Sequence, residues 1–152
     1  MLTPLNFPKA DLKLTRKDEV IYVWDIFRKR KLILTPEEWV RQHVLHYLID
    51  HKSIPASLIA SEYGIEVNKL TRRCDGVVFD RSGKPIMIIE CKAPEVKINE
   101  QVLHQIAQYN FTLKVNWLIL TNGIDTVIAF INTDTKSIDY VREIPSYDEL
   151  GV

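Results

Sequence analysis

Apolar residues recur at helical spacing in two stretches of this chain. The first stretch predicts a helix from Pro36 to about Ile49, which begins after an N-cap at Thr35 and carries proline at its first position. Its expected inward face is made of Val40, Val44, Tyr47 and Leu48. The second stretch predicts an amphipathic helix over residues 99–113. Its inner side is expected to carry Val102, Leu103, Ile106, Asn110 and Leu113.

Runs rich in β-branched and aromatic residues predict the strands between and around these helices. These runs lie at residues 20–27, 57–67, 72–80, 86–92, 116–120 and 126–131, with a short edge strand at 138–141. A helix, a three-stranded meander, a second helix and further strands indicate an α/β fold with a mixed central sheet flanked by helices. We expect an N-terminal arm at 1–19, one domain at 20–145 and a C-terminal tail at 146–152.

A β-hairpin is predicted around residues 81–84, because Arg-Ser-Gly-Lys has turn chemistry. Pairing Asp80 with Pro85 places Asp75 directly opposite Glu90, with Cβ atoms roughly 5 Å apart. Two carboxylates at that distance repel each other unless something positive lies between them. A divalent cation that binds carboxylate oxygens would meet this need.

Glu90 and Lys92 leave the apolar run 86–89 together, at the end of one strand. Residues two apart in a strand point to the same face, about 6.5 Å apart at the backbone, so the ammonium would lie beside the Glu90 carboxylate. The plainer alternative is that Asp75 ends a strand on the surface, while Glu90 and Lys92 form an exposed ion pair of little energetic value. A site is favoured because three features agree: the hairpin register brings Asp75 opposite Glu90, the spacing of two puts Glu90 and Lys92 on one face, and an apolar run precedes them.

Two glutamates follow Pro36 in the first predicted helix. Stepping 100° per residue puts Glu37 at the centre of the inward face and Glu38 well to its side. The capping box explains Glu38 as a structural residue. A carboxylate on an inward face needs a partner, and Glu37 has two alternatives: a salt bridge to Arg41 four residues later, or a role at the metal.

The composition permits one ordered domain but supplies no general attraction for nucleic acid. The chain has 152 residues, 46% of them hydrophobic, and 20 basic residues balance 20 acidic ones. Binding to a polyanion would therefore depend on local basic patches, of which residues 28–31 are one and Lys69, Arg72 and Arg73 another. Residues 1–15 lack a signal-peptide core and no segment is long enough to span a bilayer, so we expect a soluble, cytoplasmic protein without a membrane partner.

The two cysteines, Cys74 and Cys91, lack the spacing and the histidines of a zinc site. In the hairpin register above they would face each other on the side opposite Asp75 and Glu90. A cross-strand disulfide is conceivable there, but reduced core thiols are favoured in a cytosol.

In order and spacing, the chain resembles the restriction-endonuclease-like, or PD-(D/E)xK, nucleases. More narrowly, it resembles the N-terminal nuclease domain of type I restriction enzyme R subunits, over residues 20–135. The segments that support the likeness are 36–42, 72–75, 89–94, the pair Gln105 and Tyr109, and 120–123. The proline of the family name is replaced by Cys74. The glycines, at 64, 76, 83, 123 and 151, also leave no place for a phosphate-binding Gly-x-x-x-x-Gly-Lys loop, so no ATP site is expected in this chain.

The resemblance implies a DNA nuclease that uses Mg²⁺, with Mn²⁺ as a substitute, and more an endonuclease than an exonuclease. It implies that Asp75, Glu90 and the backbone carbonyl of Cys91 hold the metal, with Glu37 as a further catalytic candidate. Lys92 would orient or deprotonate the attacking water and stabilise the transition state.

Similar nucleases also use the glutamine and tyrosine to brace the site and contact DNA, so Gln105 and Tyr109 inherit that role, with Arg73 as a further DNA contact. Other restriction or DNA-processing subunits are expected partners. The alternative is a non-catalytic module of a restriction or defence complex that binds DNA or protein.

Overall fold

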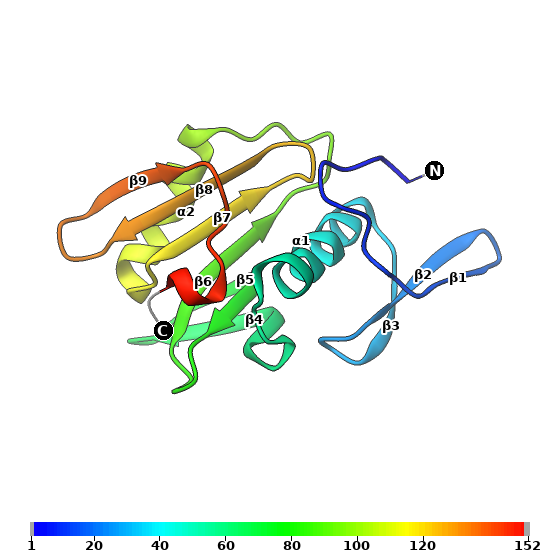
Figure 1. Cartoon of the computed structure of the whole chain (residues 1–152), viewed down its shortest axis with the longest axis horizontal. Helices are drawn as coiled ribbons and strands as arrows, with labels where there is room; N and C mark the ends of the chain where they lie inside the picture. The colour runs from blue at the N-terminus through cyan, green and yellow to red at the C-terminus, as the bar shows by residue number, and fades with distance from the viewer. Residues whose placement is uncertain (1, 151–152) are drawn as a thin grey trace.

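The structure is a computed structural model that describes residues 2–150. Its helices and strands are, in chain order, β1 Leu14–Lys17, β2 Val20–Asp25, β3 Arg30–Ile33, α1 Pro36–Lys52, the 3-10 turn η1 Ala56–Leu58, β4 Ile59–Val67, β5 Leu70–Phe79, β6 Pro85–Cys91, α2 Glu100–Leu113, β7 Trp117–Thr121, β8 Thr126–Asn132, β9 Ser137–Val141 and the 3-10 turn η2 Tyr147–Leu150. Figure 1 shows a larger sheet against α1, with a small sheet of β1–β3 beyond the N-terminal end of that helix.

The larger sheet has the order β4-β5-β6-β7-β8-β9. Strands β6 and β7 are parallel and are joined through α2, whereas every other neighbouring pair is antiparallel. This arrangement confirms the predicted α/β class with a mixed central sheet, because a parallel pair needs a crossover long enough to hold a helix.

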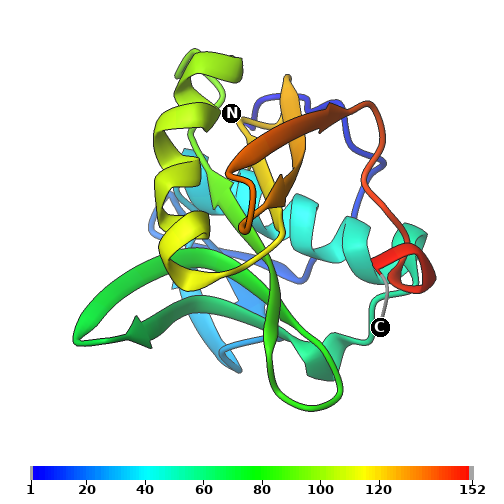
Figure 2. The ribbon, with the colours of Figure 1, turned by 90° about the vertical axis from the view of Figure 1, so that its left-hand side faces the viewer.

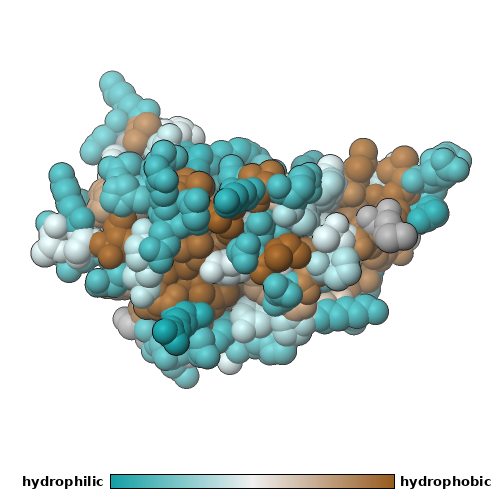
Figure 3. All heavy atoms as spheres, turned by 90° about the horizontal axis from the view of Figure 1, so that it is seen from above, coloured by the Kyte–Doolittle hydropathy of each residue, from teal (hydrophilic) through white to brown (hydrophobic). Residues whose placement is uncertain are grey.

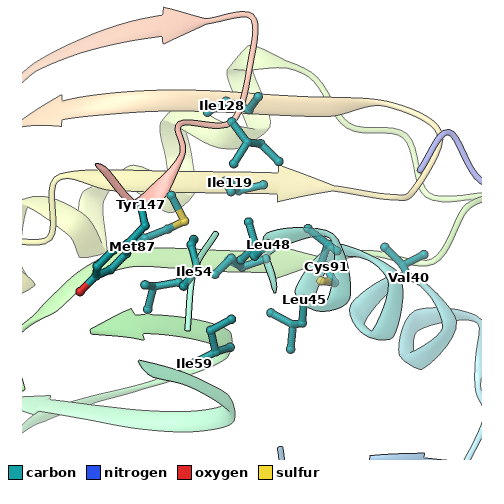
Figure 4. Close-up of a cluster of buried hydrophobic side chains, with 14 residues drawn as sticks. Val40, Leu45, Leu48, Ile54, Ile59, Met87, Cys91, Ile119, Ile128 and Tyr147 are labelled. Carbon is teal, nitrogen blue, oxygen red and sulfur yellow. The ribbon is translucent and has the colours of Figure 1, made fainter. Parts of the chain in front are cut away.

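The two helices cover opposite faces of this sheet (Figure 2). One buried cluster joins α1 to the sheet through residues such as Leu45, Leu48 and Ile119, and Figure 4 shows these side chains converging from helix and strands. The other cluster joins α2 to the opposite face through Leu103 and Ala107. The core is therefore a three-layer sandwich, and its polar edges lie where the strands end.

Helix α1 is buried on more sides than its predicted inward face. Its run from Glu38 to His46 has only one residue that is not buried, Trp39. The far side of the helix is covered by the N-terminal part of the chain: Phe7 packs on Tyr47 with ring centroids 5.3 Å apart, and Phe27 packs on His46. A helix covered from both sides carries a weak amphipathic pattern, so its sequence reveals only part of its buried surface.

The predicted elements are found with shifted ends, and two strands were missed. Helix α1 continues to Lys52, β4 begins at Ile59, and β2 ends at Asp25. Strands β1 and β3, which flank β2, have the sequences LTRK and RKLI. Such short, charged runs carry no apolar alternation, and they gain strand structure only by pairing with β2.

The predicted hairpin register holds near the sheet centre and shifts near the turn. Gly76 pairs with Ile89 as predicted, but a bulge between Val78 and Phe79 makes Phe79, not Asp80, the partner of Pro85. The cause is the turn itself, because the Asp80 carboxylate accepts the backbone N–H groups of residues 82 and 84. Asp80 is thereby a turn residue and no longer part of the ladder.

The expectation that Cys74 and Cys91 face each other is wrong. Both thiols are free and buried, but Cys91 belongs to the α1 side of the sheet and Cys74 to the α2 side. The β5–β6 ladder ends at Gly76 and Ile89, so neither Asp75 and Glu90, which were predicted to lie directly opposite each other, nor the two cysteines are ladder partners; Glu62, at the same level of β4, has a positive φ of 52°. A local change of the strand twist at this level turns the Cys74 side chain to the opposite face of the sheet from Cys91.

Candidate functional site

Asp75 lies near the start of the buried part of β5 and is held from two directions. Its Oδ2 accepts the backbone N–H of Cys91 at 2.7 Å, so the side chain takes the place of a ladder partner for β6. Its Oδ1 accepts a hydrogen bond from Arg41 Nη2 of α1 at 2.6 Å. Burial raises the pKa of Asp75, but these two donors outweigh it and hold the pKa below its ordinary value.

Glu90 lies beside Asp75 near the end of β6, and its side chain is only 9% exposed. It accepts a hydrogen bond from Arg72 Nη2 at 3.1 Å. Burial, and next the charge of Asp75, raise the pKa of Glu90 to about 8. The pKa values of the two neighbouring carboxyl groups are thus shifted in opposite directions, that of Asp75 downward and that of Glu90 upward.

Arg41 is the positive group among these acids. Its Nη2 lies 2.6 Å from Asp75 Oδ1, 2.8 Å from Glu62 Oε1 and 3.2 Å from Glu37 Oε1, and its Nη1 binds Glu38. Only 7% of the Arg41 side chain is exposed. A buried guanidinium is thus surrounded by four carboxylates, which offset the cost of its burial.

The predicted roles of the two glutamates at the start of α1 are partly wrong. The Thr35 hydroxyl accepts the Glu38 N–H at 3.1 Å, which confirms the N-cap. The Glu38 side chain, however, is only 7% exposed and binds Arg28 through both oxygens at 2.9 Å, whereas the Glu37 side chain is 47% exposed. The segment that contains Arg28 packs on α1 and buries Glu38, which a helical wheel drawn for one buried face cannot anticipate. The salt bridge of Glu37 with Arg41 is present.

Glu37 nevertheless faces the acidic cluster. Burial and the charge of Asp75 raise the pKa of Glu37, while Arg41 and Lys92 oppose this rise. Lys92 also opposes the rise in the pKa of Glu90. The half-buried Lys92 thus lowers the pKa of both glutamates, less than Arg41 does for Glu37 and less than Arg72 does for Glu90. Its backbone N–H donates to Thr121 O at 2.9 Å.

The other predicted residues lie around this cluster. Tyr109 is on α2, and its ring lies 4.4 Å from the guanidinium of Arg72, which binds Glu90. Gln105, one turn earlier, is exposed. Arg73 is 68% exposed and its Nε donates to Glu62 at 3.1 Å. The arrangement brings Asp75, Glu90, Lys92 and Glu37 together and leaves Gln105 and Arg73 on the rim.

The roles of three residues at the site were not predicted from the sequence. Arg41 was considered only as a partner of Glu37, and Arg72 only as part of a basic patch, yet each binds one of the paired carboxylates. Glu62 carried no signal, because its position depends on the positive φ that interrupts β4. Long-range ion pairs of this kind leave no trace in local periodicity.

The cluster can supply hard oxygen ligands. No group of three or more His, Cys, Asp or Glu side chains in residues 2–150 has the geometry of a preformed metal site. Mg²⁺ usually takes one or two protein carboxylates and completes its shell with water, so Asp75, Glu90 and the Cys91 carbonyl would suffice. The raised pKa of Glu90 and the hydrogen bond from Arg41 to Asp75 at 2.6 Å are both favourable responses to negative charge at this place, and a cation would be a further one.

Comparison with known proteins gives a family and a fold. The family model described as type I restriction enzyme R protein N terminus matches residues 36–145. A fragment structure of a proposed HsdR subunit of a type I restriction enzyme from Vibrio vulnificus YJ016 matches with a TM-score of 0.55 and 21% identity, over 78% of this chain and 25% of that one. This chain thus spans about a quarter of the length of the chain it matches. A search of curated proteins gave no match.

Neither α1 nor α2 combines the length and the hydropathy of a membrane-crossing helix, and they are the α-helices of the part of the chain described here.

Proposed function

The chain belongs to the family of type I restriction enzyme R protein N-terminal domains, and from this premise we propose that it is a metal-dependent nuclease that hydrolyses DNA phosphodiester bonds. One observation carries the proposal: Asp75, in the middle of β5, lies beside Glu90 near the end of β6, and burial together with the charge of Asp75 raises the pKa of Glu90 to about 8. Acids forced together in this way are typical of functional sites, because a structural protein gains nothing from their repulsion.

We propose that Asp75, Glu90 and the backbone carbonyl of Cys91 hold Mg²⁺, or Mn²⁺ in its place, with Glu37 as a ligand or a second base. A bound divalent ion would supply a water of lowered pKa and would neutralise charge on the scissile phosphate. For Asp75 to serve, its Oδ1 must be released by Arg41, which has three other carboxylates to bind.

Lys92 orients the attacking water and stabilises the negative charge that develops on the phosphate in the transition state. Its place two residues after Glu90, and its lowering effect on the pKa values of Glu37 and Glu90, support this role. Tyr109 and Gln105 of α2 contact the DNA backbone from one side of the site. Arg73, exposed on β5, contacts it from the other.

We further propose that the cut is internal, that the substrate is cytoplasmic DNA, and that other restriction subunits are partners. These properties follow the family rather than any single contact of this chain.

The test is the conversion of supercoiled plasmid to nicked and linear forms by purified protein with Mg²⁺ or Mn²⁺. We expect wild-type cleavage that stops with a chelator and falls by roughly 10²-fold or more in both Asp75→Asn and Lys92→Ala. Lys84→Ala, in the turn distant along the hairpin, is the matched control and should cleave normally. Equal cleavage by wild type and Asp75→Asn would contradict the proposal.

The ion pair of Arg41 with Asp75 favours a second candidate, a DNA- or protein-binding module without catalysis. In that case the guanidinium is the permanent counter-charge of the acids. Calorimetric titration with Mn²⁺ separates the two candidates: heat that is absent in Asp75→Asn supports the nuclease, and no heat in the wild type supports the module.

A further inference from the structure

The small sheet of β1–β3 presents an exposed face that the site does not use. Its register pairs Thr15 with Tyr22 and Trp24 with Lys31. Trp24 also receives its backbone bond from Lys13 O, at 3.0 Å. Because alternate residues of a strand share one side, this face carries Lys13, Thr15, Lys17, Val20, Tyr22, Trp24, Lys31 and Ile33, of which Ile33 is 58% exposed. We refer to six of them, Lys13, Thr15, Lys17, Tyr22, Trp24 and Lys31, as the lysine–aromatic face.

Its residues are solvent-accessible and its charge has one sign. All three lysines are exposed, and Trp24 in the central strand is 42% exposed. The acid within the strands, Asp25, lies on the opposite face, where it is fully buried and binds Arg28. Figure 3 shows hydrophobic residues, in brown, at the surface among hydrophilic ones at the end of the molecule where these strands lie; the lysines, tyrosine and tryptophan of the face are not among the brown residues, because their hydropathy is negative.

The face is hollowed around the indole. A recess of about 290 Å³ is lined by Lys13, Thr15, Trp24 and Lys31. The ammonium of Lys31 also lies 5.5 Å from the centre of the Tyr22 ring. Aromatic rings are thus exposed with ammonium groups on either side of them.

Edge protection explains part of this pattern but not all of it. Lysines on or directly before the outer strands β1 and β3 discourage pairing with another sheet, which accounts for Lys13, Lys17 and Lys31. An exposed tryptophan in the central strand has no such purpose, because it adds apolar surface that water does not favour. The exposure of Trp24 is therefore the feature that a bound ligand would explain.

We propose that the lysine–aromatic face binds single-stranded nucleic acid, with a base stacked on Trp24 and phosphates on the flanking lysines. The inference rests on the proposed function for its ligand class. Single strands suit the face better than duplex, because a ring can stack only on a base that has left its partner. The overall charge of zero supplies no attraction for a polyanion, so these local charges must provide it.

The position of the face relates it to the site. Strand β3 ends at Ile33 and α1 begins at Pro36, so the small sheet is joined to the helix end that carries Glu37 (Figure 1). A single nucleic-acid strand bound to the lysine–aromatic face would lie at the same end of α1 as the acidic cluster.

The test measures binding of fluorescein-labelled oligothymidine by anisotropy, in EDTA so that no metal-dependent cleavage occurs. Trp24→Ala should weaken binding about 5- to 100-fold, and Trp24→Phe less. Lys13→Ala with Lys31→Ala should lower the salt dependence by about 1.4 in the slope of log affinity against log salt. Lys84→Ala is the matched control and should bind as the wild type does.

A second readout reports stacking directly. Oligothymidine should quench the tryptophan fluorescence of the wild type, and Trp24→Phe should remove this quenching although Trp39 and Trp117 remain. Unchanged affinity in both the Trp24 and the lysine variants would overturn the inference. So would duplex of equal length binding as tightly with no effect of Trp24→Ala, or a dimer that Trp24→Ala separates and that binds no oligonucleotide.

The outcome for the face is independent of the outcome for the nuclease. Binding of oligothymidine by Asp75→Asn, with no plasmid cleavage by the wild type, would keep this inference and refute the nuclease. Cleavage that requires Asp75, with oligothymidine affinity unchanged in Trp24→Ala, would do the reverse.

Discussion

Replacing Arg41 with alanine removes the cation that four carboxylates share. Of these, Glu38 and Asp75 have side chains 7% and 11% exposed, so the variant leaves Asp75 without its counter-charge and leaves Glu38 with Arg28 as its remaining partner. Removing one partner of a buried pair costs about 3–5 kcal/mol. Glu37 is half exposed and adds little to this figure.

The free energy of unfolding should be measured by urea denaturation at neutral pH in EDTA, for wild type and Arg41→Ala. For a chain of this size the expected loss corresponds to a melting temperature lower by roughly 6–20 °C. Arg73→Ala is the control, because Arg73 is an arginine that pairs with the same Glu62 but is 68% exposed. Its expected loss is under ~1 kcal/mol.

A double-mutant cycle attributes the loss to the pair. In Asp75→Asn the partner charge is gone, so Arg41→Ala should cost less there, with a coupling of about 1–3 kcal/mol. Added Mg²⁺ should also stabilise Arg41→Ala more than the wild type, since the ion no longer competes with the guanidinium for Asp75. A loss below ~1 kcal/mol, or a coupling of zero, would refute the reasoning.

Three further predictions concern the site and its support. The pKa of Glu90 lies near 8 in the folded protein against 4.5 ordinarily, so between these pH values the folded state keeps a proton that the unfolded chain releases. The contribution of Glu90 to the free energy of unfolding is therefore full below pH 4.5 and is lost as pH rises to about 8. Glu90→Gln should lack this decline, so its melting temperature in EDTA should gain on the wild type between pH 5 and pH 8; a constant difference would contradict the assignment. Gly123→Ala should lower the free energy of unfolding by about 1–3 kcal/mol, because φ is +85° and the new Cβ would lie 2.6 Å from a leucine of the N-terminal segment. Gly64→Ala is the control for the same denaturation assay and should be near neutral, because the atom nearest to its new Cβ would be 3.7 Å away. Glu38→Ala should lower the free energy of unfolding by about 3 kcal/mol and Glu37→Ala by less than ~1, and the opposite order would restore the helical-wheel assignment.

The order of elements was predictable because it rests on local rules. Thr35 and Pro36 fix the start of α1 through one side-chain bond and one backbone angle, and both are read from adjacent residues. The pairing of Gly76 with Ile89 likewise follows from the length of one turn. The bulge at Val78 and Phe79 was not predictable, because it depends on how the Asp80 side chain closes that turn.

The positions of the acids were predicted, but their neighbours were not. Asp75 and Glu90 lie on adjacent strands, so counting residues brings them together. The backbone N–H of Cys91 donates to the Asp75 side chain, a bond that strand geometry alone would give to another main-chain group. The missed strands β1 and β3 have the same origin, because they exist through pairing with β2 rather than through their own pattern.

A chain of alternating charges links the small sheet to the acidic cluster. Asp25 at the end of β2 binds Arg28, Arg28 binds Glu38, Glu38 binds Arg41, and Arg41 binds Asp75. Two of these links join residues 10 and 34 positions apart, so no motif of fixed spacing could reveal them. Asp25 and Glu38 are buried and the Asp75 side chain is only 11% exposed, so the loss of one partner from these ion pairs is costly. The small sheet is therefore held at a defined position relative to Asp75, and any ligand of the lysine–aromatic face would be held at a defined position relative to the carboxylates.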